Sequence, residues 1–284
     1  MSWLFLILLS VLFFSVSTIV HRVLMKSDKS DPAAYMIVFQ FLVTFMIVIY
    51  MTIFRVALPN ILPVLPNLLL NGVLIGAASL FMFKALKFTD ASEYTILHTS
   101  ATFWTIIASA IFLNEIITFN KILGTILIIL GVIIVTWRQK KQKLVFHKGH
   151  LYTLISSTAF GLAFTNEVFI VGQIGVLQNL VIGFFLPGLF VLLIKPKAIY
   201  TMKLLLKVKN LFSMTVFSLF YLFGAVTIFA AYRAGGDASQ LYPISNLSVI
   251  STVILAAIFL RERSHLGRKI LGALAAFAGL WFLQ

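Results

Sequence analysis

One carboxylate in the middle of an apolar segment is the residue of this sequence with the clearest chemical potential. Glu167 lies in the run FTNEV at 164–168, whereas the other seven acidic residues lie at or near the ends of apolar runs. An ionisable group inside a membrane span costs about 2.5–3.5 kcal/mol on insertion scales, and it usually faces a cavity or a partner. We therefore expect Glu167 to couple protons or to bind a cation. The alternative is a place at the membrane interface.

Further polar residues occupy corresponding positions of two similar halves of the chain. Aligning Phe14 with Phe160 places His21 opposite Glu167, and Gln40 corresponds to Gln178. Polar side chains also recur at helical spacing within 91–113 and 238–260, which predicts a stripe that faces a water-accessible cavity. The alternative for His21 is a place at the membrane interface, and the alternative for the two glutamines is a structural hydrogen bond between helices. The expected cavity-lining set is His21, Gln40, His98, Glu167, Gln178, Tyr242 and Asn246.

Other charged residues and one proline have weaker or structural interpretations. Lys84 lies near the end of an apolar run, so it either binds an anionic part of the substrate or extends to the interface. Pro243 removes a helical hydrogen bond, which a membrane span tolerates only inside protein or beside a cavity. We expect Glu115 and Glu262 to be structural. Their expected partners are Lys121 for the first, and Arg263 or Arg268 for the second.

The composition places these residues in a membrane. Of 284 residues, 61% are hydrophobic and 11% are charged, whereas soluble domains have roughly 45–50% and about 25%. Runs of about 20 apolar residues suit membrane helices and are too long for membrane strands. The absence of Cys excludes disulfides and thiol catalysis. The expected fold is all-α and integral to the membrane, with ten transmembrane helices at about 2–24, 33–54, 65–86, 91–113, 120–137, 150–171, 176–194, 210–232, 238–260 and 266–283.

The chain also repeats itself. The tripeptide Asp-Ala-Ser at 90–92 recurs at 237–239, and this offset of 147 gives ten identities in the 26 positions that begin at residue 90. Each half holds five expected spans, and an odd number of crossings makes the second half enter the membrane from the opposite side. We therefore expect two inverted five-helix repeats, 1–143 and 147–284, with a substrate site near the midplane between them.

Two segments in each half resemble a known family. The first half has Phe-Leu-Asn-Glu at 112–115 and Lys-Ile-Leu-Gly at 121–124, and the second has Phe-Leu-Arg-Glu at 259–262 and Lys-Ile-Leu-Gly at 269–272. This pattern resembles the EamA-like transporters of the drug/metabolite transporter superfamily. The resemblance implies transport of a small metabolite, in a family that moves amino acids, nucleobases, sugars, amines or drugs. The first half departs from the family habit, because its fourth helix contains no proline.

These observations favour a secondary active transporter that moves a small polar or amphipathic solute by alternating access. The alternatives are an uncoupled facilitative pore and a non-transporting scaffold or receptor, which the repeat disfavours. No motif of a metalloprotease, an α/β-hydrolase or a phosphate-binding loop occurs, so we expect neither an enzyme nor a cofactor nor a metal. The expected partners are the small-molecule substrate, the lipid bilayer and, as coupling ion, protons.

The net charge of +14 reflects the membrane and not a nucleic acid, because Lys and Arg cluster where apolar runs end. The odd-numbered connections between expected spans hold 19 basic residues and the even-numbered ones hold three. Basic residues in short loops mark the cytoplasmic side. We therefore expect a plasma or inner membrane protein with both termini outside the cytoplasm, although EamA-like proteins usually keep both termini inside. The apolar run that follows Met1 lacks a cleavage site, so we expect it to be a retained helix.

Overall fold

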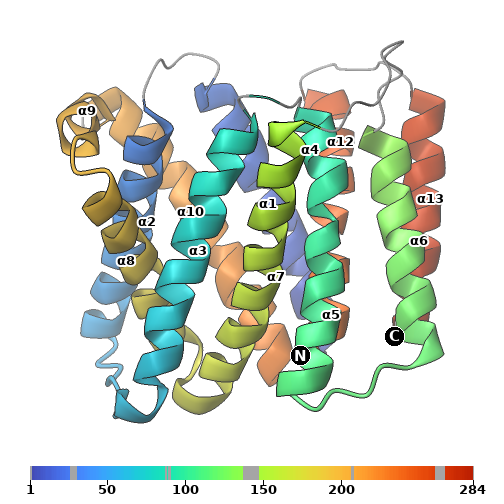
Figure 1. The fold of residues 1–284 in the computed structure, drawn as a ribbon, viewed down its shortest axis with the longest axis horizontal. Helices are drawn as coiled ribbons and strands as arrows, with labels where there is room; N and C mark the ends of the chain where they lie inside the picture. Colours follow the sequence, from blue (N-terminus) through green and yellow to red (C-terminus); the bar gives the residue numbers. More distant parts are fainter. Residues whose placement is uncertain are drawn as a thin grey trace.

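The protein is described by a computed structural model that covers residues 2–25, 31–86, 88, 91–136, 147–205, 208–259 and 266–283. Every regular element within these ranges is a helix, and most helices run side by side in one bundle (Figure 1). Both termini lie toward the same end of the bundle, and the short helix α9 lies at the opposite end (Figure 1). The prediction of an all-helical fold is thus confirmed for these ranges.

The helices follow the apolar runs of the sequence closely, because polar residues, prolines and glycines interrupt these runs. In chain order they are α1 (Trp3–Met25), α2 (Pro32–Ile53), the 3₁₀ helix η1 (Leu62–Val64), α3 (Leu65–Leu86), α4 (Ala91–His98), α5 (Ser100–Phe112), α6 (Phe119–Thr136), α7 (Lys148–Ile174), α8 (Val176–Ile194), α9 (Ala198–Leu205), α10 (Val208–Arg233), α11 (Ala238–Ser245), α12 (Leu247–Phe259) and α13 (Leu266–Phe282).

Eight helical stretches in the described residues are long and apolar enough to cross a membrane. They comprise α1, α2, α3, the α4–α5 pair, α6, α7, α8 and α10. The remaining two expected spans are represented by α11 with α12, of 8 and 13 residues, and by α13, of 17 residues. The α11–α12 pair has the same two lengths as the α4–α5 pair, and α13 is shorter than the roughly 20 residues that a straight span needs.

The expected fourth helix of each half is interrupted: the second as Pro243 indicates, and the first against the expectation of one continuous helix over 91–113. The backbone turns at Thr99 and at Asn246, which have nearly the same conformation (φ −59°, ψ −18° and φ −63°, ψ −17°). At the first turn, the Thr99 hydroxyl donates to the carbonyl of Ile96 at 2.7 Å and so competes with the helical ladder. At the second, Pro243 offers no backbone N–H.

Helices from distant parts of the chain pack closely through small residues. The hydroxyl of Ser10 in α1 donates to the carbonyl of Gly224 in α10 at 2.8 Å, and α7 contacts α3 in the same way through Ser156 and Ala78, also at 2.8 Å. Between α6 and α13 the backbones approach so closely that a β-carbon at position 131 would lie 2.5 Å from a carbonyl oxygen of α13. Small residues permit such approaches, from which membrane helices gain van der Waals contact.

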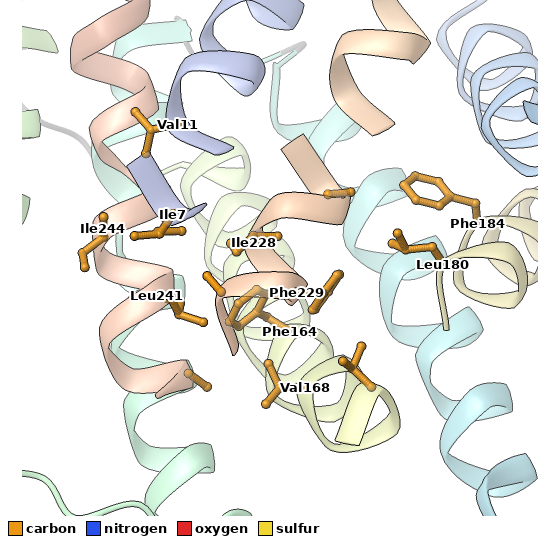
Figure 2. Packing of buried hydrophobic residues seen from close by; sticks show 14 of the residues in the cluster. Ile7, Val11, Phe164, Val168, Leu180, Phe184, Ile228, Phe229, Leu241 and Ile244 are labelled. Carbon is orange, nitrogen blue, oxygen red and sulfur yellow. The ribbon is translucent and has the colours of Figure 1, made fainter. Parts of the chain in front are cut away.

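The largest buried apolar cluster lies where α1, α7, α8, α10 and α11 meet. Figure 2 shows Phe164 of α7 beside Phe229 of α10, and their ring centroids are 5.9 Å apart. Leu241 of α11 lies on the other side of these rings and is fully buried (Figure 2). This packing fixes α7 against α10 and α11, and it thereby fixes the next turn of α7, which contains Glu167.

Candidate functional site

Glu167 lies in α7 and faces α3. Its Oε1 atom accepts a hydrogen bond from Nδ2 of Asn71, at 3.2 Å. Asn71 is 1% exposed, so the carboxylate and its amide partner meet inside the bundle and not at a helix end. A buried carboxylate needs hydrogen-bond donors or a positive charge, and one amide supplies part of that need.

A third helix completes this group through a residue with no side chain. The position that a β-carbon of Gly183 in α8 would take lies 3.5 Å from Oε1 of Glu167. The same point lies 3.9 Å from Oδ1 of Asn179 and 3.9 Å from Nδ2 of Asn71. Three polar atoms from α3, α7 and α8 therefore converge on one small space. We call Asn71, Glu167, Asn179 and Gly183 the Glu167 cluster.

The cluster contains polar atoms that the described part of the chain leaves without a partner. Asn179 is fully buried, and neither its Oδ1 nor its Nδ2 has a hydrogen-bond partner among the described residues. The Oδ1 atom of Asn71 is likewise unpartnered there. Leaving a buried polar group unpaired costs about 1–3 kcal/mol. Such atoms persist where a site needs them, and they suggest a ligand.

The neighbouring polar pair one turn away is different, because its members satisfy each other. Asn67 of α3 donates from Nδ2 to Oδ1 of Asn166, at 2.8 Å. In return, Nδ2 of Asn166 donates to the backbone carbonyl of Asn67, also at 2.8 Å. This reciprocal pair clamps α3 to α7 and fixes the direction in which Glu167 points.

Two tyrosines lie near the carboxylate. Tyr221 of α10 and Tyr242 of α11 are within electrostatic range of Glu167. The ring of Tyr242 contacts the edge of Phe164, with centroids 5.0 Å apart. Of the sequence-predicted residues, the structure therefore brings Tyr242 and Glu167 into one neighbourhood. Their helices, α7 and α11, both belong to the second expected repeat, 147–284.

His98 and Asn246 lie at the two interrupted helices. The His98 ring lies 5.2 Å from the ring of Tyr94 and 5.4 Å from that of Phe160. Its Nε2 atom is buried and has no hydrogen-bond partner among the described residues. Asn246 donates from Nδ2 to the hydroxyl oxygen of Thr102 at 2.8 Å. The second break is thus tied to α5, which follows the first break.

The two predicted glutamines have unlike surroundings. Gln40 of α2 is 5% exposed, and its β-carbon lies 3.0 Å from the position of a β-carbon on Gly188. Its Oε1 atom is unpartnered within the described residues. Gln178 lies in the first turn of α8 and donates to the carbonyl of Ala57, in the connection between α2 and η1, at 3.2 Å. The structure therefore places Gln178 at a helix end, away from the position that its neighbour Asn179 takes in the cluster.

Lys84 is exposed near the end of α3, and its Nζ lies over the rings of Phe81 and Tyr152, 5.0 and 5.9 Å from their centroids. These contacts are of the cation–π kind, and they do not bring Lys84 to the Glu167 cluster. His21 lies in α1, but its side chain is outside the described residues.

Glu115 corrects a second expectation. The sequence suggested that this carboxylate pairs with Lys121, but its two oxygens accept from the backbone N–H groups of Ala238 (2.7 Å) and Ser239 (2.9 Å). These are the first free donors of α11, and a helix N-terminus stabilises negative charge. Asn114 has φ of 54°, a conformation that asparagine tolerates and that turns the chain after α5 so that Glu115 reaches α11.

Lys121 of α6 pairs instead with Asp237, the residue that precedes α11. It also donates to the carbonyl of Ile116 at 3.0 Å. Gln240 accepts from the backbone N–H of Asp237 through Oε1 and donates to the carbonyl of Leu283 at 2.7 Å. We call Glu115, Lys121, Asp237 and Gln240, together with the start of α11, the α11 lock. The counterpart carboxylate Glu262 lies outside the described residues.

Sequence reasoning missed Asn71 and Asn179. Both are asparagines inside apolar runs, a signal that was available, but neither carries a charge nor matches a polar residue in the aligned half. Among the described residues, no group of three or more His, Cys, Asp or Glu side chains is placed to hold a metal ion. The site is therefore one carboxylate among amides and aromatic rings.

Comparisons with known proteins bear on the fold and on the family of the chain. Residues 1–137 match the model of the EamA-like transporter family. A crystal structure of another protein superposes on 99% of this chain and 95% of its own, with a TM-score of 0.76 and 12% sequence identity. At that identity the likeness shows a shared fold alone. No curated protein matches the chain. The chain is therefore a multi-pass membrane protein whose residues 1–137 are similar to the EamA-like transporter family.

Proposed function

We propose that the protein is a secondary active transporter that moves a small metabolite, such as an amino acid, an amine or a similar polar or amphipathic solute, across the cell membrane by alternating access. The observation that supports this most directly is a set of paired contacts between the two halves of the chain. An uncoupled facilitative pore is the second candidate, since such a pore would use the same fold. A non-transporting scaffold has less support.

The paired contacts support an inverted repeat. Adding 146 to Ser10 gives Ser156, and subtracting 146 from Gly224 gives Ala78, so the α1–α10 and α3–α7 hydrogen bonds are counterparts of one another. The backbone breaks at Thr99 and Asn246 differ by 147, which is the offset of the sequence repeat. Relations of this kind are typical of two halves that are related by a two-fold axis in the membrane plane.

The contact between α6 and α13 supports the same axis. Gly124 lies against Gly279, and Gly131 lies against Gly272. Adding 148 to 124 gives 272, and adding 148 to 131 gives 279. A two-fold operation that relates the two halves would therefore exchange the two contacts. We therefore propose repeats at 1–143 and 147–284, each with five membrane-crossing helices. The interrupted α11–α12 and the short α13 complete the ten crossings.

In this proposal, Glu167 is the coupling carboxylate, and His21, Gln40, His98, Gln178, Tyr242 and Asn246 are the remaining candidates for the cavity lining. At the two interrupted helices, backbone N–H and carbonyl groups are free to face the cavity, whereas in an unbroken helix they would form hydrogen bonds within the helix. The partial burial of Glu167 and its contact with Asn71 favour it over the exposed Lys84 as the residue that responds to an ion. The aromatic neighbours Tyr221 and Tyr242 suit a solute with an apolar part.

The test uses the full-length protein in liposomes. A thermal-shift screen of metabolite classes first identifies a solute that stabilises the purified protein, and uptake of that solute is then measured with and without a pH gradient. A gradient should raise accumulation at least about tenfold if coupling is real, which corresponds to about 1.4 kcal/mol. If the solute inside the liposomes only reaches the outside concentration, with or without the pH gradient, the protein is a facilitative pore instead.

Glu167→Gln should abolish the response of uptake to the pH gradient and should leave folding intact, because the amide keeps the shape but cannot exchange a proton. Gln173→Asn is the matched control, since Gln173 is exposed in the last turn of α7 and belongs to no candidate site. It should retain the response. Gradient-driven uptake that persists unchanged in Glu167→Gln would refute the assignment of Glu167.

Orientation is a separate part of the proposal. The basic residues favour the end of the bundle opposite to the termini as the cytoplasmic end. A reporter that is active only in the cytoplasm and is fused after Gln284 should therefore be silent. A strong signal from it would reverse the orientation without affecting the proposed transport.

A further inference from the structure

We infer that the Glu167 cluster binds a monovalent metal cation of the size of sodium. The inference rests on the proposed function for its physiological role, in which the cation occupies the coupling carboxylate when no proton does, but the binding can be measured without transport. Two hydrogen-bond acceptors of the cluster lead to the inference. Oε1 of Glu167 and Oδ1 of Asn179 face the same small space above Gly183, at 3.5 and 3.9 Å from one point. Two acceptors that share a space repel each other unless a donor or a cation lies between them.

The protein supplies only part of that compensation. Asn71 donates one N–H to Glu167, but Oδ1 of Asn179 receives no hydrogen bond from any described residue. The Oδ1 atom of Asn71 also has no partner among the described residues. Rotating the Asn71 amide by 180° would exchange its nitrogen and oxygen and would bring a third oxygen to the cluster. Carboxylate and amide oxygens are the ligands that hard cations take, and membrane transporters bind sodium through carbonyl oxygens at the midplane.

Charge indicates a monovalent ion. Glu167 supplies one negative charge, and the other members of the cluster are neutral. A monovalent cation therefore leaves the site neutral inside the membrane, where a net charge is costly. A divalent cation would leave one uncompensated positive charge in the same surroundings.

Size indicates a single atom. A methyl group placed on Gly183 would be in ordinary van der Waals contact with all three polar atoms. The point that this methyl group would occupy is therefore close enough to all three polar atoms for a bare ion to lie among them. The same geometry provides the test variant: Gly183→Ala keeps every polar group of the cluster, fits without a clash, and fills the space.

The experiment compares melting midpoints of the purified full-length protein in NaCl, KCl, methylammonium chloride and choline chloride at equal ionic strength. Sodium should raise the midpoint by at least about 3 °C over choline at saturation. Gly183→Ala should abolish the rise. Gly172→Ala, a substitution in α7 whose β-carbon also meets only ordinary contacts, should retain it. Equilibrium binding of radioactive sodium should show the same loss in Gly183→Ala, even if that variant melts at a different temperature.

Several results would overturn the inference. Equal midpoints in all four salts would show that the cluster holds no cation, and a sodium effect that survives in Gly183→Ala would place the ion elsewhere. A rise in KCl as large as that in NaCl would contradict the size argument. A larger rise in methylammonium chloride would assign the carboxylate to a substrate amine. None of these results bears on uptake in liposomes, so the proposed transport function stands or fails separately.

Discussion

The α11 lock and the Glu167 cluster are both built around one carboxylate, but they differ in how fully their polar atoms are paired. In the lock, both oxygens of Glu115 accept backbone N–H groups, Asp237 pairs with Lys121, and both ends of the Gln240 amide are bonded. In the cluster, one oxygen of Glu167 has one described donor, and the amide of Asn179 has no described partner.

This difference separates structure from function. Fully paired polar groups stabilise one arrangement of helices, whereas unpaired buried groups reduce stability by about 1–3 kcal/mol each. Residues whose polar atoms lack hydrogen-bond partners in the resting protein are the better candidates for binding a ligand. By this criterion we expect Glu115 to be structural, although it lies in a family motif, and we expect Glu167 to be functional. Each of the following substitutions tests one side of that comparison.

The largest expected effect is that of Glu115→Ala. It removes the acceptor for two N–H groups at the start of α11, so the free energy of unfolding should fall by about 2–4 kcal/mol. Thermal and denaturant unfolding in detergent measures the loss. Ile116→Ala is the control, because Ile116 is 76% exposed and its replacement should change stability by less than about 0.5 kcal/mol. A loss below about 1 kcal/mol for Glu115→Ala would show that the lock is weak.

Asn179→Leu should have a smaller effect of the opposite sign. Replacing a buried unpaired amide by an apolar side chain of similar size removes a desolvation cost, so the protein without ligand should gain about 1–2 kcal/mol. Uptake should be lost in the same variant. The matched comparison is Asn166→Leu, which breaks the satisfied pair with Asn67 and should destabilise. Equal losses of stability in both variants would contradict the distinction between the two amides.

The smallest expected effect is that of Asp237→Asn. Asparagine keeps the capping ability of aspartate at a helix start, so this substitution removes only the ion pair with Lys121. The Asp237 side chain is 42% exposed, and pairs of this kind are worth about 1 kcal/mol or less. Unfolding at low and high salt measures it. A loss as large as that of Glu115→Ala would move the centre of the lock from the helix start to the ion pair.

The sequence predicted the helices well, because long apolar runs between polar connections leave little choice in a membrane. It predicted disruption only at Pro243, whereas the first half breaks at Thr99 without a proline. That break depends on a hydroxyl that bonds a nearby carbonyl, and threonine also occurs inside regular helices. A proline-based rule therefore finds one of the two breaks.

The candidate site was predicted in part. Glu167 was found because a charge inside an apolar run is conspicuous, but its partner Asn71 depends on which face of α3 meets α7. That choice is made by packing between helices that are distant in the chain. The same reason explains why Lys121 was paired with Glu115: nearness in sequence favoured that pair, and the fold brought Asp237 to Lys121 instead.

The hydrogen bond between Gln240 and Leu283 has a consequence for biogenesis. Membrane proteins are synthesised from the N-terminus, so Glu115 and Lys121 enter the membrane long before their partners at the start of α11 exist. The amide of Gln240 must then wait for the carbonyl of Leu283, a fully buried residue directly after α13. The lock is therefore completed only when α13 has left the ribosome. A chain that lost α13 would leave the amide of Gln240 without this acceptor.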